Sequence, residues 1–256
     1  MISLKKLRYP GETFSLLFSI IIALLTISFI LEFSYWLLII IIIGQLLYVI
    51  IGQKQIQGNS IIITSKQYPE INKIIEESCI KLEMVKPDCF ITFDPYINAF
   101  VMGFKKPYTL VITTALIEAM DNEELKFVIA HELGHIKMNH SRLKSLVMPL
   151  DRNIPVITMI FNFWLRKSEY TADRIGLYVV ENVKISTNAL LKLTVGAKLY
   201  KGIKVEELIS QITTSYDEFM EKIGELFLTH PYITNRIHNI VEFFNFDIKK
   251  TDGNNL

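Results

Sequence analysis

Residues 131–135 read HELGH, and this pentapeptide decides how the rest of the chain is interpreted. It falls in a segment from 121 to about 144 whose apolar residues recur at helical spacing. With about 3.6 residues per turn, His131 and His135 lie on one helix face, where both imidazoles can reach one metal ion. Glu132 lies beside them, where its carboxylate can accept a proton from water. The spacing is typical of a zinc hydrolase site on a helix.

The surroundings of the pentapeptide support a helix. Asp121 followed by Glu124 is a capping-box pattern at its expected start. The chain has five histidines, so a pair with this spacing around a glutamate seldom arises from composition alone. The alternative is a surface helix whose polar side chains are merely solvated.

A third ligand must come from elsewhere, because catalytic zinc takes three protein ligands and leaves a fourth position for water. Glu169 in a second helical segment is the candidate. Asp173 lies four residues later on the same face, where it is expected to hydrogen-bond a ligand imidazole and fix its tautomer. The alternative is a solvated helix face.

The start of the chain is strongly apolar. Residues 14–31, FSLLFSIIIALLTISFIL, and residues 35–51 each just reach the roughly 17 residues that a helix needs to cross a bilayer. We expect a tight antiparallel transmembrane hairpin, with a buried core hairpin or a cleaved signal peptide as alternatives. Lys5, Lys6 and Arg8 precede the first run, which puts the N-terminus and all that follows the hairpin in the cytoplasm.

Composition narrows the function classes. With 27 basic and 26 acidic residues, the formal charge is +1, which argues against a nucleic-acid binder. Two cysteines exclude a disulfide-rich scaffold and a four-cysteine metal site. The mean hydropathy of +0.32 averages an apolar hairpin with a domain of ordinary composition. We therefore divide the chain into a membrane hairpin (1–53), a metallopeptidase domain (54–248) and a polar tail (249–256).

Periodicity gives a coarse fold. The predicted strands and helices form an α+β fold: a mostly helical domain with a small antiparallel sheet, which the HELGH signature marks as zincin-like. The apolar segment 146–165 contains prolines and charges, so we favour a helix buried against the domain or lying at the membrane surface over another span. Strands are expected at 61–63, 88–94, 98–104 and 108–113, and helices at 68–84, 156–181, 206–228 and 235–244.

Four motifs in order give the chain a family resemblance. It resembles the HtpX and CAAX-prenyl-protease family of membrane-bound gluzincin metallopeptidases over essentially residues 1–244. HELGH matches the core motif, and Glu169 to Asp173, EYTAD, matches the family's E-x-x-A-D. Residues 98–100, NAF, and the pair 230–231, HP, followed by Arg236, resemble two further elements.

This resemblance implies zinc-dependent hydrolysis of peptide bonds. One zinc per chain would be held by His131, His135 and Glu169, and Glu132 would act as general base and then pass the proton to the leaving amine. The expected protein is a multi-pass cell-membrane endopeptidase acting on unfolded or membrane proteins. Its partners would be a protein or peptide substrate and the lipid bilayer, with no nucleic acid.

The same resemblance assigns residues around the substrate. Asn98, Ala99 and Phe100 would pair with the substrate backbone as an added strand. His230 would donate a hydrogen bond to the oxyanion, with Arg236 nearby. The alternatives are a plain sheet strand at 98–100, a loop residue at His230 and a structural salt bridge at Arg236.

Other interpretations remain. A membrane-tethered binding or regulatory module with a vestigial zinc site is one, although intact His131, Glu132, His135 and Glu169 argue against it. A prenyl-peptide protease is another, for which the number of expected spans is small. His140 and His238 match no motif position, and both are expected at the surface.

Overall fold

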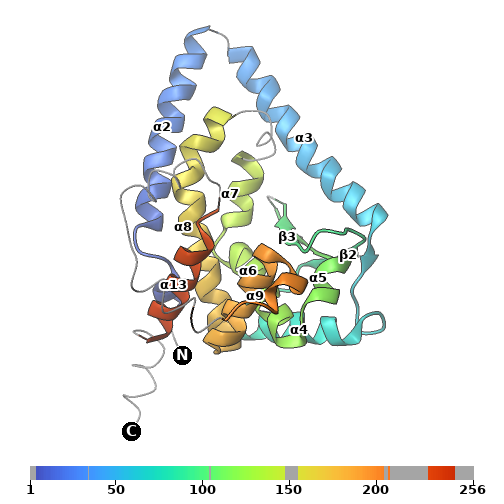
Figure 1. Ribbon diagram of the computed structural model, residues 1–256. Coiled ribbons are helices and arrows are strands. Elements are labelled where there is room, and N and C mark those ends of the chain that lie inside the picture. The colour runs from blue at the N-terminus through green and yellow to red at the C-terminus, as the bar shows by residue number, and fades with distance from the viewer. Residues whose placement is uncertain are drawn as a thin grey trace.

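The computed structural model describes residues 4–33, 35–103, 105–147, 155–204, 207 and 230–245. Helices predominate and four short strands form one sheet, so the mostly helical α+β class is confirmed (Figure 1). The elements are α1 (Leu4–Leu7), α2 (Glu12–Phe33), α3 (Tyr35–Asn59), β1 (Ile61–Ile62), α4 (Pro69–Lys81), β2 (Asp88–Thr92), β3 (Ala99–Met102), β4 (Thr109–Thr113), α5 (Thr114–Ala119), α6 (Asn122–Lys137), α7 (His140–Val147), α8 (Pro155–Val180), α9 (Val183–Val195), α10 (Ala197–Tyr200) and α13 (Ile233–Phe243).

The sheet is mixed, and the prediction of an antiparallel sheet was wrong for its central pair. The strand order is β1-β2-β4-β3, in which β2 and β4 run parallel and the two outer pairings are antiparallel. The chain forms the edge strand β3 first and then inserts β4 between β2 and β3. Alternation along a strand identifies the strand but not its neighbour, so this order could not be read from the pattern.

The tight hairpin expected of the two apolar N-terminal helices is not confirmed, because α2 and α3 meet at an open angle (Figure 1). Figure 1 shows α2 and α3 spreading apart, with α2 alongside α8 and α3 leading down toward the sheet. Helix α3 also continues to Asn59, past the predicted domain boundary at residue 53.

One helix is a candidate membrane span among the described residues. The stretch Glu12–Phe29 of α2 is long and apolar enough to cross a bilayer, and only 17% of it is buried. Phe14 and Leu25 on this helix are each more than 60% exposed. The second predicted span, in α3, does not pass the same test over the described residues, so a two-helix membrane hairpin remains a prediction.

Helix α6 is the centre of the domain and contacts α4, α8, α9 and β3. The predicted capping box is present. The Asp121 carboxylate accepts a hydrogen bond from the backbone N–H of Glu124, and the Glu124 carboxylate accepts one from the backbone N–H of Asp121. The helix ends at Lys137, however, and does not run to residue 144. Asn139 adopts a left-handed conformation, with φ of 63°, which asparagine tolerates well, and the chain turns there into α7.

Two glycines let α6 and α8 approach closely. A Cβ on Gly134 of α6 would lie 3.0 Å from the Ile175 side chain, and a Cβ on Gly176 of α8 would lie 2.7 Å from the Phe127 ring. Either methyl group would push the two helices apart. The close approach brings the face of α6 that carries HELGH against the face of α8 that carries EYTAD.

Helix α8 accounts for part of the ambiguous segment 146–165. Within it, Phe161, Trp164 and Leu165 are buried and pack with Leu16 and Ala23 of α2. This packing agrees with the helix buried against the rest of the molecule. Residues 148–154, nearly all of the predicted helix 206–228 and the tail 249–256 lie outside the described residues.

Candidate metal centre

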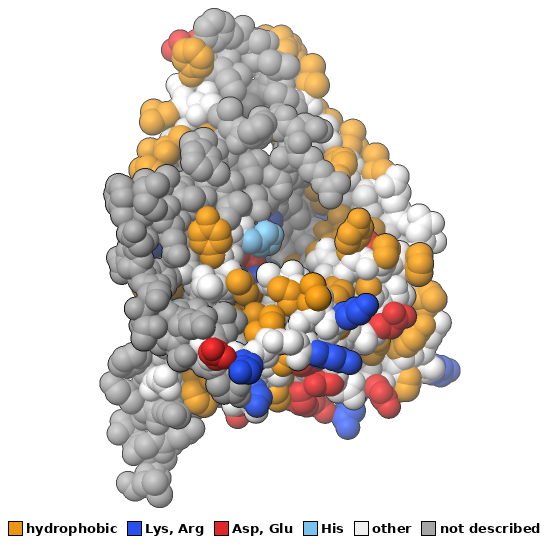
Figure 2. All heavy atoms as spheres, viewed as in Figure 1, with side chains coloured by type: hydrophobic (Ala, Val, Ile, Leu, Met, Phe, Trp, Pro, Cys, Tyr) orange, Lys and Arg blue, Asp and Glu red, His pale blue; other side chains and the backbone are white. Residues whose placement is uncertain are grey.

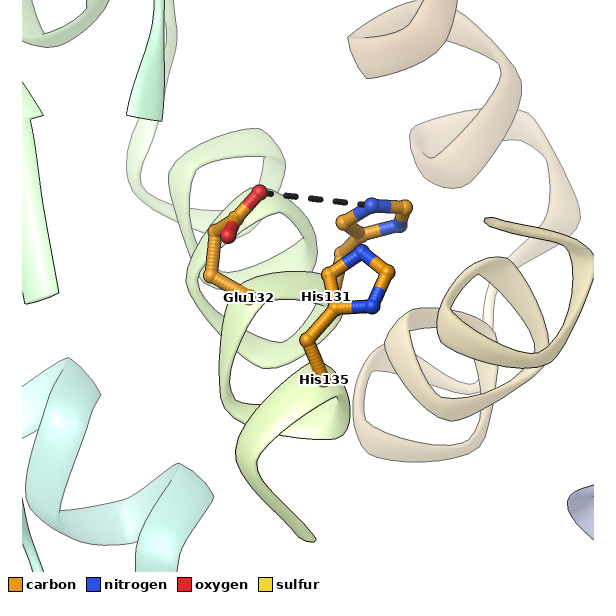
Figure 3. Close-up of side chains that lie close together, drawn as sticks. All are labelled: His131, Glu132 and His135. Atoms are coloured by element: carbon orange, nitrogen blue, oxygen red, sulfur yellow. Dashed lines mark ion pairs between the residues drawn. The ribbon is translucent and has the colours of Figure 1, made fainter. Parts of the chain in front are cut away.

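The HELGH side chains lie together on α6. Figure 3 shows the imidazoles of His131 and His135 on one side of the helix, with the Glu132 carboxylate turned toward them. One donor atom from each of the three lies within 4.8 Å of the others. The Glu132 carboxylate is 4.0 Å from His131 Nε2, so it borders the donor pair at a longer distance than a shared ligand would.

Glu169 of α8 completes the donor set. Its Oε2 lies 3.4 Å from His131 Nε2, and its Oε1 lies 3.3 Å from His135 Nε2. Zinc bonds of about 2.0–2.2 Å in a tetrahedron place two ligand atoms about 3.4 Å apart. The spacing and the chemistry of these two imidazoles and one carboxylate therefore fit a zinc ion.

Asp173 supports His131 from behind. Its Oδ1 lies 3.0 Å from His131 Nδ1, the ring nitrogen that faces away from Glu169. Arg236 of α13 donates to both oxygens of Asp173, at 2.6 and 2.8 Å. Burial alone disfavours the ionised carboxyl, but Arg236 and His131 together outweigh it and lower the pKa of Asp173. An ionised Asp173 accepts a hydrogen bond from His131 Nδ1–H, which leaves His131 Nε2 as the nitrogen that can coordinate a metal.

His140 is buried at the site, so its assignment to the surface was wrong. Only 1% of its surface is exposed, its Nδ1 lies 3.1 Å from His135 Nδ1, and its Nε2 lies 3.0 Å from Glu12 Oε1. The turn at Asn139 causes this, because it folds α7 back against α6. The available signal was Glu12 itself, one of only two charged residues between Gly11 and Gln53.

Lys144 of α7 adds a cation to the donor set. Its Nζ donates to Glu169 Oε1 at 2.7 Å and lies 3.4 Å from His135 Nε2. Burial opposes ionisation of Glu169, but Lys144 and the neighbouring imidazoles hold its pKa well below the usual value. The carboxylate is thus ionised and faces positive charge.

A cleft of about 260 Å³ opens beside the donors. Figure 2 shows pale-blue histidine atoms in a hollow of this face, with hydrophobic side chains beside it. The cleft has both a polar and an apolar wall. Its lining consists of Ile97, Asn98, Ala99, Phe127, Val128, His131, Glu132, Glu169, Leu190, Leu193, Thr194, His230 and Arg236.

The structure separates the three residues of the NAF motif. Asn98 and Ala99 line this cleft, next to the edge strand β3. Phe100 instead lines a separate cavity of about 730 Å³ between β3 and α3, together with Tyr48 and Met102. Successive side chains of a strand point to opposite faces, so Phe100 is turned away from the donors.

The late motif reaches the site at two points. His230 is largely exposed, and its Nδ1 lies 3.5 Å from Glu169 Oε2. Arg236 borders the cleft, but its guanidinium is bound to Asp173, which agrees better with the salt-bridge alternative than with substrate binding. His238, the other histidine expected at the surface, is partly exposed and pairs with Glu242.

The environment separates the proton affinities of the site residues. Burial raises the pKa of Glu132 to about 7. Burial alone would lower the pKa of His131, but hydrogen bonds to Asp173 and Glu169 raise it to about 9. Burial, aided by the charge of Lys144, lowers the pKa of His135 well below its usual value.

Known proteins resemble the chain both in amino-acid sequence and in fold. A family model described as "Peptidase family M48" matches residues 65–159 and 152–243. The chain is 29% identical over 175 residues to "Plastoglobule-localized metallopeptidase 48, chloroplastic" of Arabidopsis thaliana, covering 63% of this chain and 50% of that protein. It is 30% identical over 204 residues to a "Protease HtpX homolog" of Helicobacter acinonychis (strain Sheeba), covering 66% and 63%.

The fold has a solved relative. The crystal structure of S. mikatae Ste24p matches with a TM-score of 0.50 and 15% identity, covering 90% of this chain and 64% of that one. The chain thus spans between half and just under two thirds of the length of these relatives. The resemblance to HtpX and the CAAX proteases is confirmed, and since the family model matches more than half of its residues, the chain belongs to peptidase family M48.

Proposed function

We propose that this protein is a membrane-anchored, zinc-dependent endopeptidase that hydrolyses peptide bonds in unfolded or membrane proteins. The observation that carries the proposal is the convergence of His131 Nε2, His135 Nε2 and the Glu169 carboxylate at 3.3–3.4 Å, with Glu132 beside them. Zinc held by these three residues would polarise the scissile carbonyl and make water a better nucleophile.

Glu132 is the general base of the proposed reaction. Its carboxylate accepts a proton from the attacking water and then passes it to the leaving amine. A pKa of about 7 suits both steps, because the group can gain and lose a proton near neutral pH. The Glu132 carboxylate borders both the donor atoms and the cleft, where a water molecule and the substrate would meet.

The substrate would lie along β3. This strand is at the edge of the sheet, and an extended peptide can add to such an edge through backbone hydrogen bonds. Asn98 and Ala99 border the cleft at the start of β3, and His230 lies across from them, where it can donate to the oxyanion. Backbone pairing accepts many sequences, which suits a peptidase for unfolded chains.

The membrane anchor is the apolar N-terminal region. The apolar side chains that α2 exposes are unfavourable in water, so this surface suits contact with a bilayer or a partner protein. The basic residues that precede α2 favour a cytoplasmic N-terminus and a domain on that side of a cell membrane, with α3 as a second span.

The test compares full-length protein in detergent with Glu132→Gln, using zinc content and cleavage of unfolded casein. We expect Glu132→Gln to keep its zinc and to lose about 10²–10⁴-fold in activity. Glu123→Gln, the same change on an exposed part of α6, is the matched control and should cleave normally.

Two results would contradict the proposal. Full activity in Glu132→Gln would exclude the general-base role. Absence of zinc from wild-type protein, with His135→Ala behaving identically, would exclude the metal site.

A further inference from the structure

The start of α2 lies against the donor residues. Glu12, the first residue of this apolar helix, is completely buried. Its carboxylate accepts from Arg8 Nη1 at 2.7 Å, from His140 Nε2 at 3.0 Å and from the Thr171 hydroxyl. Burying a carboxylate costs free energy unless its oxygens accept hydrogen bonds in this way. The start of α2 therefore places a hydrogen-bonded negative charge next to His140.

His140 connects that charge to His135. The nitrogen of His135 that faces Glu169 is Nε2, so in a metal-ligating imidazole the proton lies on Nδ1. That Nδ1–H then donates to His140 Nδ1 across 3.1 Å, and His140 donates through Nε2–H to Glu12. Each donor in the series meets one acceptor.

The series is enclosed by apolar packing. The Trp164 ring meets the His140 ring edge-on at 6.0 Å between centroids, and Trp164 is completely buried. His140 is itself 1% exposed, and among the described residues its ring nitrogens are hydrogen-bonded to His135 and Glu12. Hydrogen bonds in such surroundings fix ring orientation strongly.

We propose that Glu12 and His140 are positioning residues of the metal centre: Glu12 orients His140, which fixes the tautomer and ring orientation of His135. The inference rests on the proposed function, because it takes His135 as a zinc ligand. It assigns to the apolar N-terminal helix a part in metal binding besides anchoring.

The experiment measures the zinc dissociation constant of full-length protein in detergent by competition with a chromophoric chelator. We expect Glu12→Ala and His140→Ala to weaken zinc binding about 10–100-fold, the usual range when such a supporting partner is lost. Glu12→Gln keeps the volume and one acceptor oxygen but loses the charge, so its loss should be smaller, at least about threefold.

Matched controls separate positioning from general damage. Ser19→Ala removes a partly buried hydrogen bond from α2 to the Ile160 carbonyl oxygen and leaves Glu12, His140 and His135 in place. His238→Ala removes a histidine outside the site. Both should bind zinc within about twofold of wild type. The visible spectrum of the cobalt-substituted protein should change in Glu12→Gln but not in Ser19→Ala, because it reports ligand geometry.

The outcomes are distinct. Wild-type protein that binds no zinc would overturn the proposed function and this inference together. Wild-type protein that binds zinc, with Glu12→Gln and His140→Ala within twofold of it, would overturn this inference alone. Glu12→Gln decides the matter if Glu12→Ala does not fold.

Discussion

The two histidines of HELGH are supported from opposite sides by different means. Behind His131 the support is short: the carboxylate of Asp173 contacts the ring directly at 3.0 Å, and Arg236 holds that carboxylate. All three residues belong to the helices of the domain, α6, α8 and α13.

Behind His135 the support is longer. A second imidazole, His140, intervenes before the carboxylate of Glu12, and Arg8 holds that carboxylate at 2.7 Å. The carboxylate and its arginine come from the N-terminal segment, far away in sequence. The comparison teaches that the same arrangement, imidazole to carboxylate to arginine, is internal to the domain on one side and depends on docking of α2 on the other.

The largest expected effect is on the internal side. Asp173→Asn leaves the Arg236 guanidinium, which is only 14% exposed, without its counter-charge. We expect unfolding to become easier by about 3–5 kcal/mol and zinc binding to weaken about 100-fold. Urea unfolding and chelator competition measure the two. Asp88→Asn on β2 is the control, and equal behaviour of the two variants would remove the basis of the comparison.

Gly176→Ala should disturb both sides together. The added Cβ would lie 2.7 Å from the Phe127 ring and 3.1 Å from the Phe127 carbonyl oxygen, so α6 and α8 must separate. We expect a loss of about 1–3 kcal/mol in stability and weaker zinc binding. Gly44→Ala on α3, where nothing lies within 4 Å, should instead be neutral or stabilising by up to about 1 kcal/mol. Similar losses in the two variants would contradict the argument from close packing.

Proton release on zinc binding should distinguish the two imidazoles. With a pKa of about 9, His131 is protonated at pH 7 in the metal-free protein, whereas His135, with its lowered pKa, is neutral. Because zinc requires neutral imidazoles, binding should release about one proton, and the apparent affinity should rise with pH up to about 9.

Calorimetry in buffers of different ionisation enthalpy counts that proton. The Glu132→Gln background is preferable, since the Glu132 carboxyl, with a pKa of about 7, would otherwise contribute. Adding Asp173→Asn should reduce the count, because Asp173 helps to hold the proton on His131. A count near two, or near zero, would show that the two rings are not distinguished in this way.

The smallest expected effect concerns the outer arginine. Arg8 is 34% exposed, and Glu12 keeps two other donors without it, so Arg8→Met should cost no more than about 1 kcal/mol. Arg236→Met should cost several times as much, because Arg236 is itself only 14% exposed and donates to both oxygens of its buried partner Asp173. Thermal unfolding of the two variants side by side measures this, and equal losses would mean that both arginines contribute alike.

What could be predicted from the sequence was local. The capping box at Asp121, the one-turn spacing of His131 and His135 and the four-residue spacing of Glu169 and Asp173 are properties of single helices. The resemblance then ordered these pieces into one site. The mostly helical fold follows from the same periodicity.

What could not be predicted depends on contacts between distant segments. The sequence around His140 does not indicate that Asn139 adopts a left-handed conformation. It also does not indicate that Glu12 contacts His140. The parallel pairing of β2 with β4 likewise joins segments whose patterns are independent. The position of Phe100, in contrast, could be predicted. Successive side chains of a strand point to opposite faces, so Phe100 and Ala99 were bound to line different sides of β3.

The burial of Glu12 bears on how separable the anchor and the enzyme are. Cutting the chain at the predicted boundary near residue 53 would give a fragment of more favourable solubility, but without the carboxylate that His140 contacts. If Glu12 positions His140 as proposed, a catalytic unit detached from its N-terminal helix would not keep the properties that it has in the whole chain. On that proposal, an inhibitor screen or a metal titration done on such a fragment would probe a site that lacks the Glu12 carboxylate.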